Sequence, residues 1–303
     1  MLFQLNESTV IGGLENVGDY FSHTITDHPL LQMDEIRKLV KRIPKKVFYS
    51  AGIKPESATI GDGDTHPGKH PLDYAIDNME NANAYMYIIS PETDDQFKPL
   101  YLQLKADLDE FCRRNGYRAT GSKLALFISS PGAISPHHMD HQHTFIAQIK
   151  GSKTLYQWPA QNLDVTTPEE LEIFLARVTR ALAVKEESEC WRTPYELSPG
   201  KGAYIPFVAP HSVTNGNEVS ISLSIFFNTE STQRLQNIFR ANHFLRTICH
   251  LLPSFPGQSA WKDELKNQYF RIYDLSLVLM AVPGRAVRKL KRIVVGATKL
   301  QGA

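Results

Sequence analysis

A succession of short β-rich runs over residues 121–228 limits the folds open to this chain of 303 residues. The runs are KLALFIS, TFIAQIK, TLYQW, GAYIP and VSISLSIFF, and turn residues separate them. In the last run, apolar residues alternate with serines, which predicts a strand with one buried face: Val219, Ile221, Leu223 and Ile225. Because most of the runs follow one another without a helix between them, the segment predicts an antiparallel barrel or sandwich.

Helical patterns flank and interrupt this segment. PLLQMDEIRKLVKRIP and PLYLQLKADLDEFCRRNG, both before it, repeat apolar residues at helical spacing. The second pattern ends in Asn115-Gly116, which is typical of a helix C-cap. Inside the segment, Thr167-Pro168 followed by two glutamates indicates a helix start, and the apolar pattern then continues to Leu182.

The order of these patterns predicts one large domain with an appended helical segment. The domain covers residues 1–230, with an elaboration of helices and loops over about 1–120 and a core over about 120–228. Residues 231–303 are expected to be helical, and the last helix, about 285–295, carries basic but no acidic residues. The expected fold class is therefore mainly β with added helices, and with a helical C-terminal segment.

Composition and charge exclude several classes of protein. Lys and Arg number 33 against 32 Asp and Glu, which argues against a protein whose main task is to hold a phosphate backbone. Three cysteines far apart form neither a disulfide framework nor a zinc ribbon, and they favour a reducing compartment. We see no signal peptide and no apolar run near the roughly 20 residues that span a bilayer. A cytoplasmic protein is therefore expected.

Histidine is concentrated between two of the β-rich runs, where four of the 11 histidines lie in the motif PHHMDHQH. In an extended segment, residues two apart point to the same side, so the side chains of His138 and Asp140 converge. His211, which follows GAYIP through a short loop, is the best candidate for a third ligand. Two histidines and one carboxylate are the ligand set of non-haem Fe(II) oxygenases, whose open positions take a 2-oxoacid and O₂.

The neighbouring histidines leave other interpretations open. His141 and His143 form the H-x-H pair of ordinary metal cupins, and with His211 they would build a metal site that is not an oxygenase. On an extended segment His137 and His141 point away from His138, so we interpret both as supporting or surface groups. His143 is then a candidate for the mouth of the substrate site. A binding or regulatory protein without turnover is a further possibility.

The motifs resemble a known family over about residues 120–228. HMDHQHTFIAQIKGSK, preceded by SP, and the later AYIPFVAPH are similar to the JmjC-type, cupin-like 2-oxoglutarate oxygenases. Within this family, the asparaginyl hydroxylase that acts on hypoxia-inducible factor is the most similar. The resemblance implies a double-stranded β-helix, which is the cupin type of jelly roll. It also implies an Fe(II)- and 2-oxoglutarate-dependent dioxygenase that hydroxylates a C–H bond and releases succinate and CO₂.

The same resemblance implies roles for individual residues. The implied iron ligands are the three inferred above: His138, Asp140 and His211. Lys153 would pair with the distal carboxylate of 2-oxoglutarate, because a buried carboxylate needs a partner charge. Ser135 would offer a hydroxyl to the same carboxylate. Thr144 and Ser224 stand where the asparaginyl hydroxylase carries asparagines, so we expect both to bind the cosubstrate in an altered geometry.

The expected substrate is a peptide or protein side chain, or a small metabolite, and the same chemistry beside a nitrogen atom would demethylate. We expect no nucleic-acid partner and no transmembrane segment. Helices after the barrel form the dimer interface in the hydroxylase that the chain resembles, which implies a homodimer through the C-terminal helices.

Overall fold

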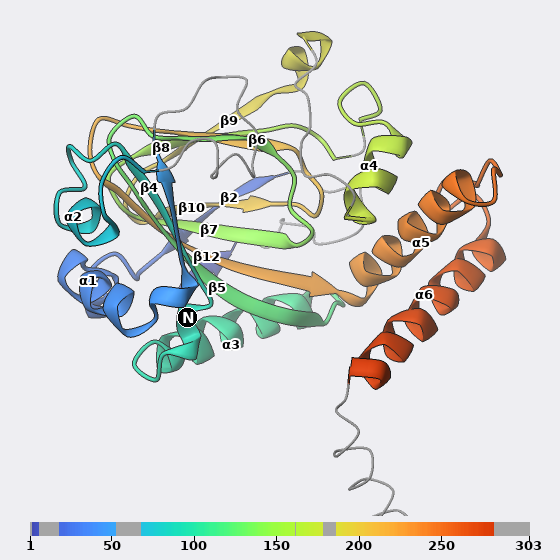
Figure 1. The fold of residues 1–303 in the computed structure, drawn as a ribbon, viewed down its shortest axis with the longest axis horizontal. Coiled ribbons are helices and arrows are strands. Elements are labelled where there is room, and N and C mark those ends of the chain that lie inside the picture. Colours follow the sequence, from blue (N-terminus) through green and yellow to red (C-terminus); the bar gives the residue numbers. More distant parts are fainter. Residues whose placement is uncertain (1, 6–17, 53–67, 161, 178–185, 282–303) are drawn as a thin grey trace, which may run out of the picture. The chain divides into compact units, whose positions relative to one another are not determined.

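The computed structural model describes residues 2–5, 18–52, 68–160, 162–177 and 186–281. The chain divides into two compact units, Met1–Gln233 and Arg234–Ala303. Figure 1 traces the strands and helices of the first unit and the two long helices toward the C-terminus, α5 (Glu230–Thr247) and α6 (Ala260–Ala281).

The described strands form two antiparallel sheets. The larger sheet has the spatial order β1 (Phe3–Leu5), β2 (Asp19–His23), β10 (Lys201–Ile205), β7 (His143–Lys150), β12 (Ser220–Thr229), β5 (Ala119–Ser129), β4 (Ala84–Ile89) and β3 (Val47–Ala51). The smaller sheet has the order β6 (Ile134–His138), β11 (His211–Asn215), β8 (Lys153–Gln157) and β9 (Thr193–Leu197). Because the chain passes repeatedly from one sheet to the other, the two sheets form a double-stranded β-helix, and the predicted fold class is confirmed.

The α-helices are α1 (Met33–Arg42), α2 (Leu72–Asp77), α3 (Lys98–Arg114), α4 (Pro168–Leu175), α5 (Glu230–Thr247) and α6 (Ala260–Ala281). Short 3₁₀ turns are η1 (Pro29–Leu31), η2 (Pro44–Lys46), η3 (Pro91–Thr93) and η4 (Glu186–Trp191). The helices predicted from the two N-terminal patterns are α1 and α3. None of the helices in the described part of the chain has the length and apolarity that a membrane span requires.

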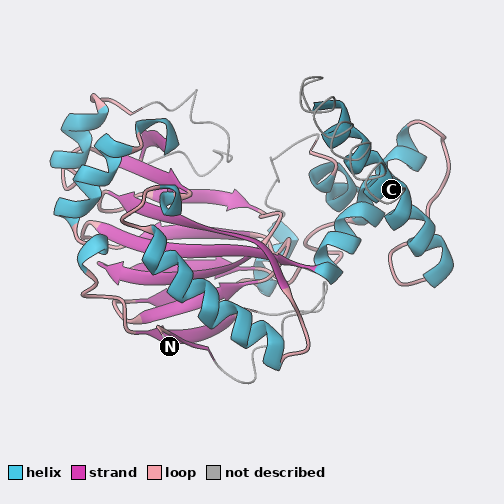
Figure 2. Ribbon diagram, turned by 90° about the horizontal axis from the view of Figure 1, so that it is seen from below, coloured by secondary structure: helices cyan, strands magenta, loops and turns pink. Residues whose placement is uncertain are grey.

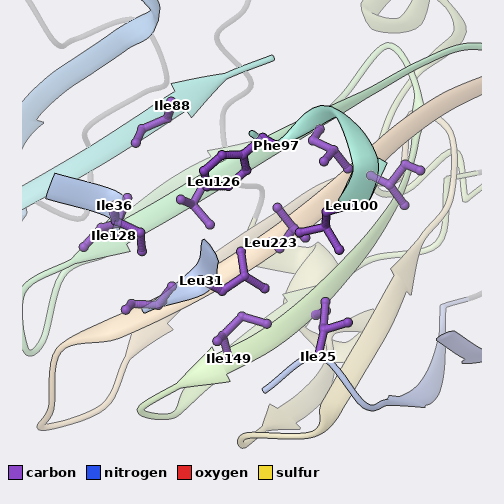
Figure 3. Packing of buried hydrophobic residues seen from close by; sticks show 14 of the residues in the cluster. Ile25, Leu31, Ile36, Ile88, Phe97, Leu100, Leu126, Ile128, Ile149 and Leu223 are labelled. Carbon is purple, nitrogen blue, oxygen red and sulfur yellow. The ribbon is translucent and has the colours of Figure 1, made fainter. Parts of the chain in front are cut away.

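The main hydrophobic core lies between the outer face of the larger sheet and the helices that cover it. Leu126 of β5 and Leu223 of β12 are opposite each other in the ladder, and both are fully buried. In Figure 2, α3 lies across the strands of this sheet, and its leucines at helical spacing, Leu100, Leu104 and Leu108, join the core. Figure 3 shows Leu100 of α3 and Ile36 of α1 among buried side chains of β4, β5, β7 and β12. The core therefore occupies one side of the larger sheet and leaves the other side for a polar interior.

The serines of β12 lie on that interior side. The alternating pattern predicted a strand with a single buried face, but Ser220, Ser222 and Ser224 are each at most 1% exposed. Their face is turned toward the smaller sheet, from which Lys153 Nζ donates a hydrogen bond to Ser222 Oγ at 2.9 Å. The expectation of one buried face was therefore wrong, because the second sheet covers the polar face as well.

Helix α4 is shorter than its sequence pattern predicted. Thr167 begins it with a capping box, in which Thr167 Oγ1 accepts from the Glu170 N–H and the Glu170 carboxylate accepts from the Thr167 N–H. The helix ends at Leu175, and Arg177 has a left-handed φ of +63° that cannot continue it. Leu182, the last residue of the predicted pattern, lies outside the described residues.

In the second unit, α5 and α6 are joined by a bidentate ion pair. Arg240 donates to Asp274 at 2.7 and 2.8 Å, and the Arg240 guanidinium lies 4.4 Å from the centroid of the Phe270 ring. Such a planar, forked pair fixes the relative position of the two helices better than a single contact does. The predicted basic helix at about 285–295 lies outside the described residues.

Candidate metal centre

His138, Asp140 and His211 come together where β6 and β11 pair. His138 is the last residue of β6, His211 is the first residue of β11, and the two are directly opposite in the ladder. Asp140 follows in the loop after β6. One ligand atom from each residue lies within 4.8 Å of the other two, and His211 Nε2 is 3.8 Å from Asp140 Oδ2. The antiparallel pairing of two strands thus brings a distant histidine to the local His-x-Asp pair.

Backbone carbonyl groups orient both imidazole rings. His138 Nδ1 is 2.7 Å from the carbonyl oxygen of Pro136, and His211 Nδ1 is 2.9 Å from the carbonyl oxygen of Ala209. A carbonyl oxygen can only accept, so each Nδ1 carries the hydrogen and donates it. In the neutral ring this leaves the lone pair on Nε2, and this is the form of imidazole that binds a metal ion. With ring centroids 4.1 Å apart, the two histidines offer these lone pairs to one site.

Burial makes this group electrostatically suited to a cation. Burial lowers the pKa of His138 well below its usual value, and the neighbouring His211 lowers it further. Burial raises the pKa of Asp140, although His211 and Lys123 act in the opposite direction. The Asp140 side chain is 28% exposed, so solvent still reaches it. Two imidazoles and a partly desolvated carboxylate are a donor set that fits Fe(II), which would compensate for the lost hydration of the carboxylate.

The loop between β10 and β11 is tied to the same group. The Val208 N–H donates to the Asp140 carbonyl oxygen at 3.2 Å, and the Trp158 N–H donates to the Pro210 carbonyl oxygen at 2.9 Å. Val208 has a φ of +53°, a left-handed conformation that is strained for a β-branched residue and costs about 1–3 kcal/mol. These bonds hold the strained loop so that His211 enters β11 opposite His138.

A β-bulge turns Ser135 to the same side as His138. His211 is opposite His138 but Val213 is opposite Ser135, so the register shifts by one residue between the two pairs. The extra residue lets side chains three positions apart both point into the barrel. The Ser135 side chain is buried and forms a hydrogen bond with the side chain of Tyr85, and burial raises the pKa of this tyrosine.

Lys153, the first residue of β8, also points into the barrel. It is opposite Asn215 on the strand that carries His211, and its side chain is only 5% exposed. Among the described residues its ammonium has Ser222 Oγ as a hydrogen-bond partner and no carboxylate in ion-pair contact. Burial lowers the pKa of Lys153 to about 7. A buried ammonium without a counter-ion is unfavourable, so this end of the interior is suited to an anion.

The remaining predicted cosubstrate residues lie on the inner face of the larger sheet. Thr144, the second residue of β7, is 2% exposed, and its hydroxyl helps to lower the pKa of the nearby Asp140 carboxyl. Ser224 of β12 is 1% exposed and is opposite Ile146 of β7. Ile146 shares a face with Thr144 because the two residues are two apart in one strand. Both predicted residues therefore face the interior, Thr144 beside the candidate ligands.

His143 points the opposite way. Strand alternation turns it outward into an aromatic cluster, where its ring stacks on Phe227 with centroids 5.1 Å apart. The Phe207 N–H donates to His143 Nδ1, and the Tyr204 hydroxyl lies 2.8 Å from the same nitrogen. Because Nδ1 accepts, the ring hydrogen is on Nε2, and burial lowers the pKa of His143 to about 3. The expectation that His143 lines the substrate mouth was wrong, since the residue belongs to the other face of its strand.

The alternative ligand set of His141, His143 and His211 is not assembled. Within the described residues, the group formed by His138, Asp140 and His211 is the one whose three donors lie in mutual reach. The two remaining histidines of PHHMDHQH, which are neither the candidate ligand His138 nor the outward His143, pack against aromatic rings. His137 lies edge-on to a tryptophan and His141 stacks on a phenylalanine.

Sequence reasoning missed two residues of the interior, Tyr85 and Ser222. In AYMYIIS, Tyr85 and Tyr87 alternate with the buried Met86 and Ile88, which was the available signal for a second, aromatic face. Ser222 belongs to the alternating pattern of β12, but nothing local indicated that its polar face is covered. Only the pairing of the sheets reveals that each side chain reaches the interior.

Two antiparallel sheets that enclose buried polar side chains and a His–Asp–His group define a cupin-type double-stranded β-helix with a candidate metal centre. A model of the cupin-like domain family matches residues 64–233, which is more than half of the 303 residues. The chain therefore belongs to the cupin-like domain family. No curated protein matches the chain at a significant level. The closer likeness to the asparaginyl hydroxylase stays a prediction.

Several solved structures are similar to this chain at low sequence identity. The ribosomal oxygenase YcfD of Escherichia coli is 15% identical with a TM-score of 0.47, and the match covers 93% of this chain and 69% of that chain. The same oxygenase in complex with cobalt and 2-oxoglutarate is 17% identical with a TM-score of 0.44, covering 89% and 65%. The DMSP lyase DddQ of Ruegeria pomeroyi is 11% identical with a TM-score of 0.24, covering 35% and 38%. These likenesses are too distant to assign an activity, so the function rests on the site.

Proposed function

We propose that this protein is an Fe(II)- and 2-oxoglutarate-dependent dioxygenase that hydroxylates a C–H bond of a peptide or protein side chain, or of a small metabolite. The observation that carries the proposal is the pairing of two sites in one interior. His138, Asp140 and His211 each bring one potential ligand atom within 4.8 Å of the others there, and the buried Lys153, which has no counter-ion among the described residues, faces the same interior. A metal-binding protein of another kind has no need of the second site.

The residues have distinct tasks in this proposal. His138, Asp140 and His211 would hold Fe(II), and the hydrogen bonds from the Nδ1 atoms of the two histidines to backbone carbonyls leave both Nε2 atoms as the donor atoms for the ion. When bound, Fe(II) with 2-oxoglutarate supplies the oxidising chemistry that uses O₂ and releases succinate and CO₂. Asp140, at 28% exposure, is the most accessible of the three ligands, so the substrate is expected to approach from its side.

Lys153 would hold the far carboxylate of 2-oxoglutarate. The Lys153 ammonium is buried beside a hydroxyl, and a bound carboxylate would compensate for the hydration that it has lost. A charge-assisted hydrogen bond of this kind is worth about 1.5–3 kcal/mol. The Ser135 and Tyr85 hydroxyls form a further polar group on the interior side. Thr144 and Ser224, buried on the inner face, complete the proposed cosubstrate pocket.

The proposal is tested by succinate formation from 2-oxoglutarate, screened across peptide and metabolite pools with Fe(II) present. Anaerobic titration with Fe(II) and 2-oxoglutarate separates an oxygenase from a binding protein, because a weak visible charge-transfer band is expected when both bind together. A protein that binds the metal but produces neither the band nor succinate would be the non-catalytic alternative. The nearly balanced charge, +1 overall, supports a substrate other than nucleic acid. A cytoplasmic location stays a prediction.

We also propose that the protein forms a homodimer through α5 and α6. One face of α6 carries large apolar side chains at helical spacing that are 50–67% exposed: Trp261, Leu265, Tyr269 and Ile272. Phe244 at the end of α5 extends this face by stacking on Tyr269. A contiguous apolar face of this kind is characteristic of an interface. The apolar Leu275, Leu277, Val278 and Leu279, which we also expected to contribute, have side chains outside the described set.

Replacing Leu265 and Ile272 together by glutamate is expected to convert a dimer into a monomer, because each carboxylate would have to lose its hydration at the interface. Light scattering coupled to size-exclusion chromatography at micromolar concentration measures the change. Arg271→Glu, an equally large change of charge beside the apolar face, is the matched control and should stay dimeric. A wild-type protein that is already monomeric would contradict the proposal.

A further inference from the structure

The two histidines that flank the candidate ligands have no role in the proposed function, and both contact aromatic rings of one chain segment. This segment is the connection between β8 and β9, described over residues 158–160, 162–177 and 186–192. His137 precedes the first ligand and lies edge-on to Trp158, with ring centroids 4.6 Å apart. His141 follows the Asp140 ligand and stacks on Phe174, with centroids 4.1 Å apart and planes at 9°. The β8–β9 connection thus contacts the residue before His138 and the residue after Asp140.

Trp158 touches both halves of the candidate centre. Its ring packs on His137, which precedes the His138 ligand. Its backbone N–H donates to the carbonyl oxygen of Pro210, which precedes the His211 ligand. The indole Nε1–H donates in turn to the Ser188 carbonyl oxygen at 3.1 Å, which fixes the ring plane. The residue is 4% exposed. Trp158 therefore couples two chain segments that must hold a common geometry.

Phe174 is held firmly enough to serve as a support. It lies on α4, which begins with the capping box at Thr167 and buries Leu171 and Leu175. Its partner His141 lies in the loop between β6 and β7, next to Asp140, whose backbone lies outside the strands and is held by the hydrogen bond from the Val208 N–H. The nearly parallel stack fixes a ring one residue away from the carboxylate ligand. A support on a capped helix is more rigid than one on a loop.

We infer that Trp158 and Phe174 are positioning residues for the metal centre. Their contacts with His137 and His141 hold His138 and Asp140 in a ligating geometry before any metal binds. The inference rests on the proposed function, since it concerns the same three ligands. Preorganisation of this kind strengthens metal binding, because less motion has to be lost when the ion arrives.

Phe174→Ala is expected to weaken Co(II) binding by about tenfold, within the range that residues supporting metal ligands usually contribute. Co(II) titration, followed by the visible absorption of the bound ion, measures the affinity. In the metal-free protein, the amide hydrogens of residues 139–142 are expected to exchange faster with solvent. Phe111→Ala is the matched control: Phe111 is also buried, but it packs edge-on to Phe145 in the outer core, so it should leave both quantities unchanged.

Variants of His141 keep the test clear if Phe174→Ala folds poorly. His141→Ala removes the same stack from a partly exposed position, so it should weaken Co(II) binding equally, and the two changes combined should add little more. His141→Phe restores a flat ring but has no metal donor. It should bind Co(II) as the wild type does, whereas loss of binding would mean that His141 is itself a ligand.

The outcomes separate this inference from the proposed function. If the wild type binds Co(II) no better than Asp140→Ala does, the metal centre itself is wrong. If the wild type binds Co(II) through Asp140 but Phe174→Ala and His141→Ala change neither the affinity nor the hydrogen exchange, the positioning role is wrong and the metal centre stands.

Discussion

Asp140→Ala should reduce succinate formation from 2-oxoglutarate more than about a hundredfold, since removing a group that merely supports a metal ligand already costs about 10–100-fold. The fold should survive. Burial raises the pKa of Asp140, which means that the folded metal-free protein disfavours its ionised form, and removal of the carboxyl relieves that cost. Urea unfolding should therefore give a free energy equal to or slightly above that of the wild type.

Binding of the metal provides an independent measure of the same change. An ion that binds only the folded state raises the unfolding temperature of the wild type, and Asp140→Ala should lose most of this shift. His143→Gln is the informative comparison, because His143 is a ligand in the alternative set but faces the outer aromatic cluster in the structure. Retained metal binding in Asp140→Ala together with its loss in His143→Gln would reverse the assignment.

Lys153→Ala should raise the concentration of 2-oxoglutarate required for half-maximal activity by at least about tenfold. Loss of a buried partner charge costs about 3–5 kcal/mol, and each decade of affinity corresponds to about 1.4 kcal/mol. Lys153→Arg should bind the cosubstrate better than the alanine variant but less well than the wild type, because the planar guanidinium is larger than an ammonium. Binding of Fe(II) alone should barely change in either variant. An unaltered requirement for 2-oxoglutarate would remove the lysine from the cosubstrate site.

The pH dependence of cosubstrate binding follows from the same residue. Burial lowers the pKa of Lys153 to about 7, so the free protein loses its ammonium charge as the pH rises above 7. Affinity for the dianion should then fall by up to about tenfold for each pH unit, until the higher pKa of the bound state is passed. Below pH 7 the affinity should level off. Lys153→Ala should abolish this slope, and calorimetric titration at several pH values would measure it.

The same shift has an opposite consequence for stability. The folded pKa of Lys153 lies below its unfolded value of about 10.4, so the unfolded state binds more protons between pH 7 and 10.4. In the absence of 2-oxoglutarate, the contribution of Lys153 to the free energy of unfolding should therefore increase as the pH rises through this window.

Local patterns were enough to predict much of the architecture. The alternation in VSISLSIFF and the apolar spacing of the two N-terminal patterns correspond to β12, α1 and α3, because hydrophobic periodicity reports which side of an element is buried. Hydrophobic periodicity does not predict the end of an element when the residue that ends it is not marked by a change in the apolar pattern. Thr167 marked the start of α4 correctly, but the left-handed Arg177 beyond its end had no signature in the residue types.

The interior was less predictable, because it depends on contacts between residues far apart in the chain. His-x-Asp predicted that an imidazole and a carboxylate share a side, and His138 and Asp140 do lie within reach of each other. The inward turn of Ser135 depends on a register shift against β11, which nothing in the sequence of β6 encodes. The hydrogen bond between Lys153 and Ser222 likewise joins two sheets.

The outward position of His143 illustrates the same division. Its sequence neighbours identify a strand, and residue types alone can specify that successive side chains alternate. They cannot specify which of the two faces will enclose the polar site and which will meet α3, because that depends on how the second sheet and the helices close over the first. In this chain the sequence alone predicted the alternation of side chains. Which face became the interior, and therefore which residues form the candidate centre, was determined by the packing of segments that are distant in the sequence.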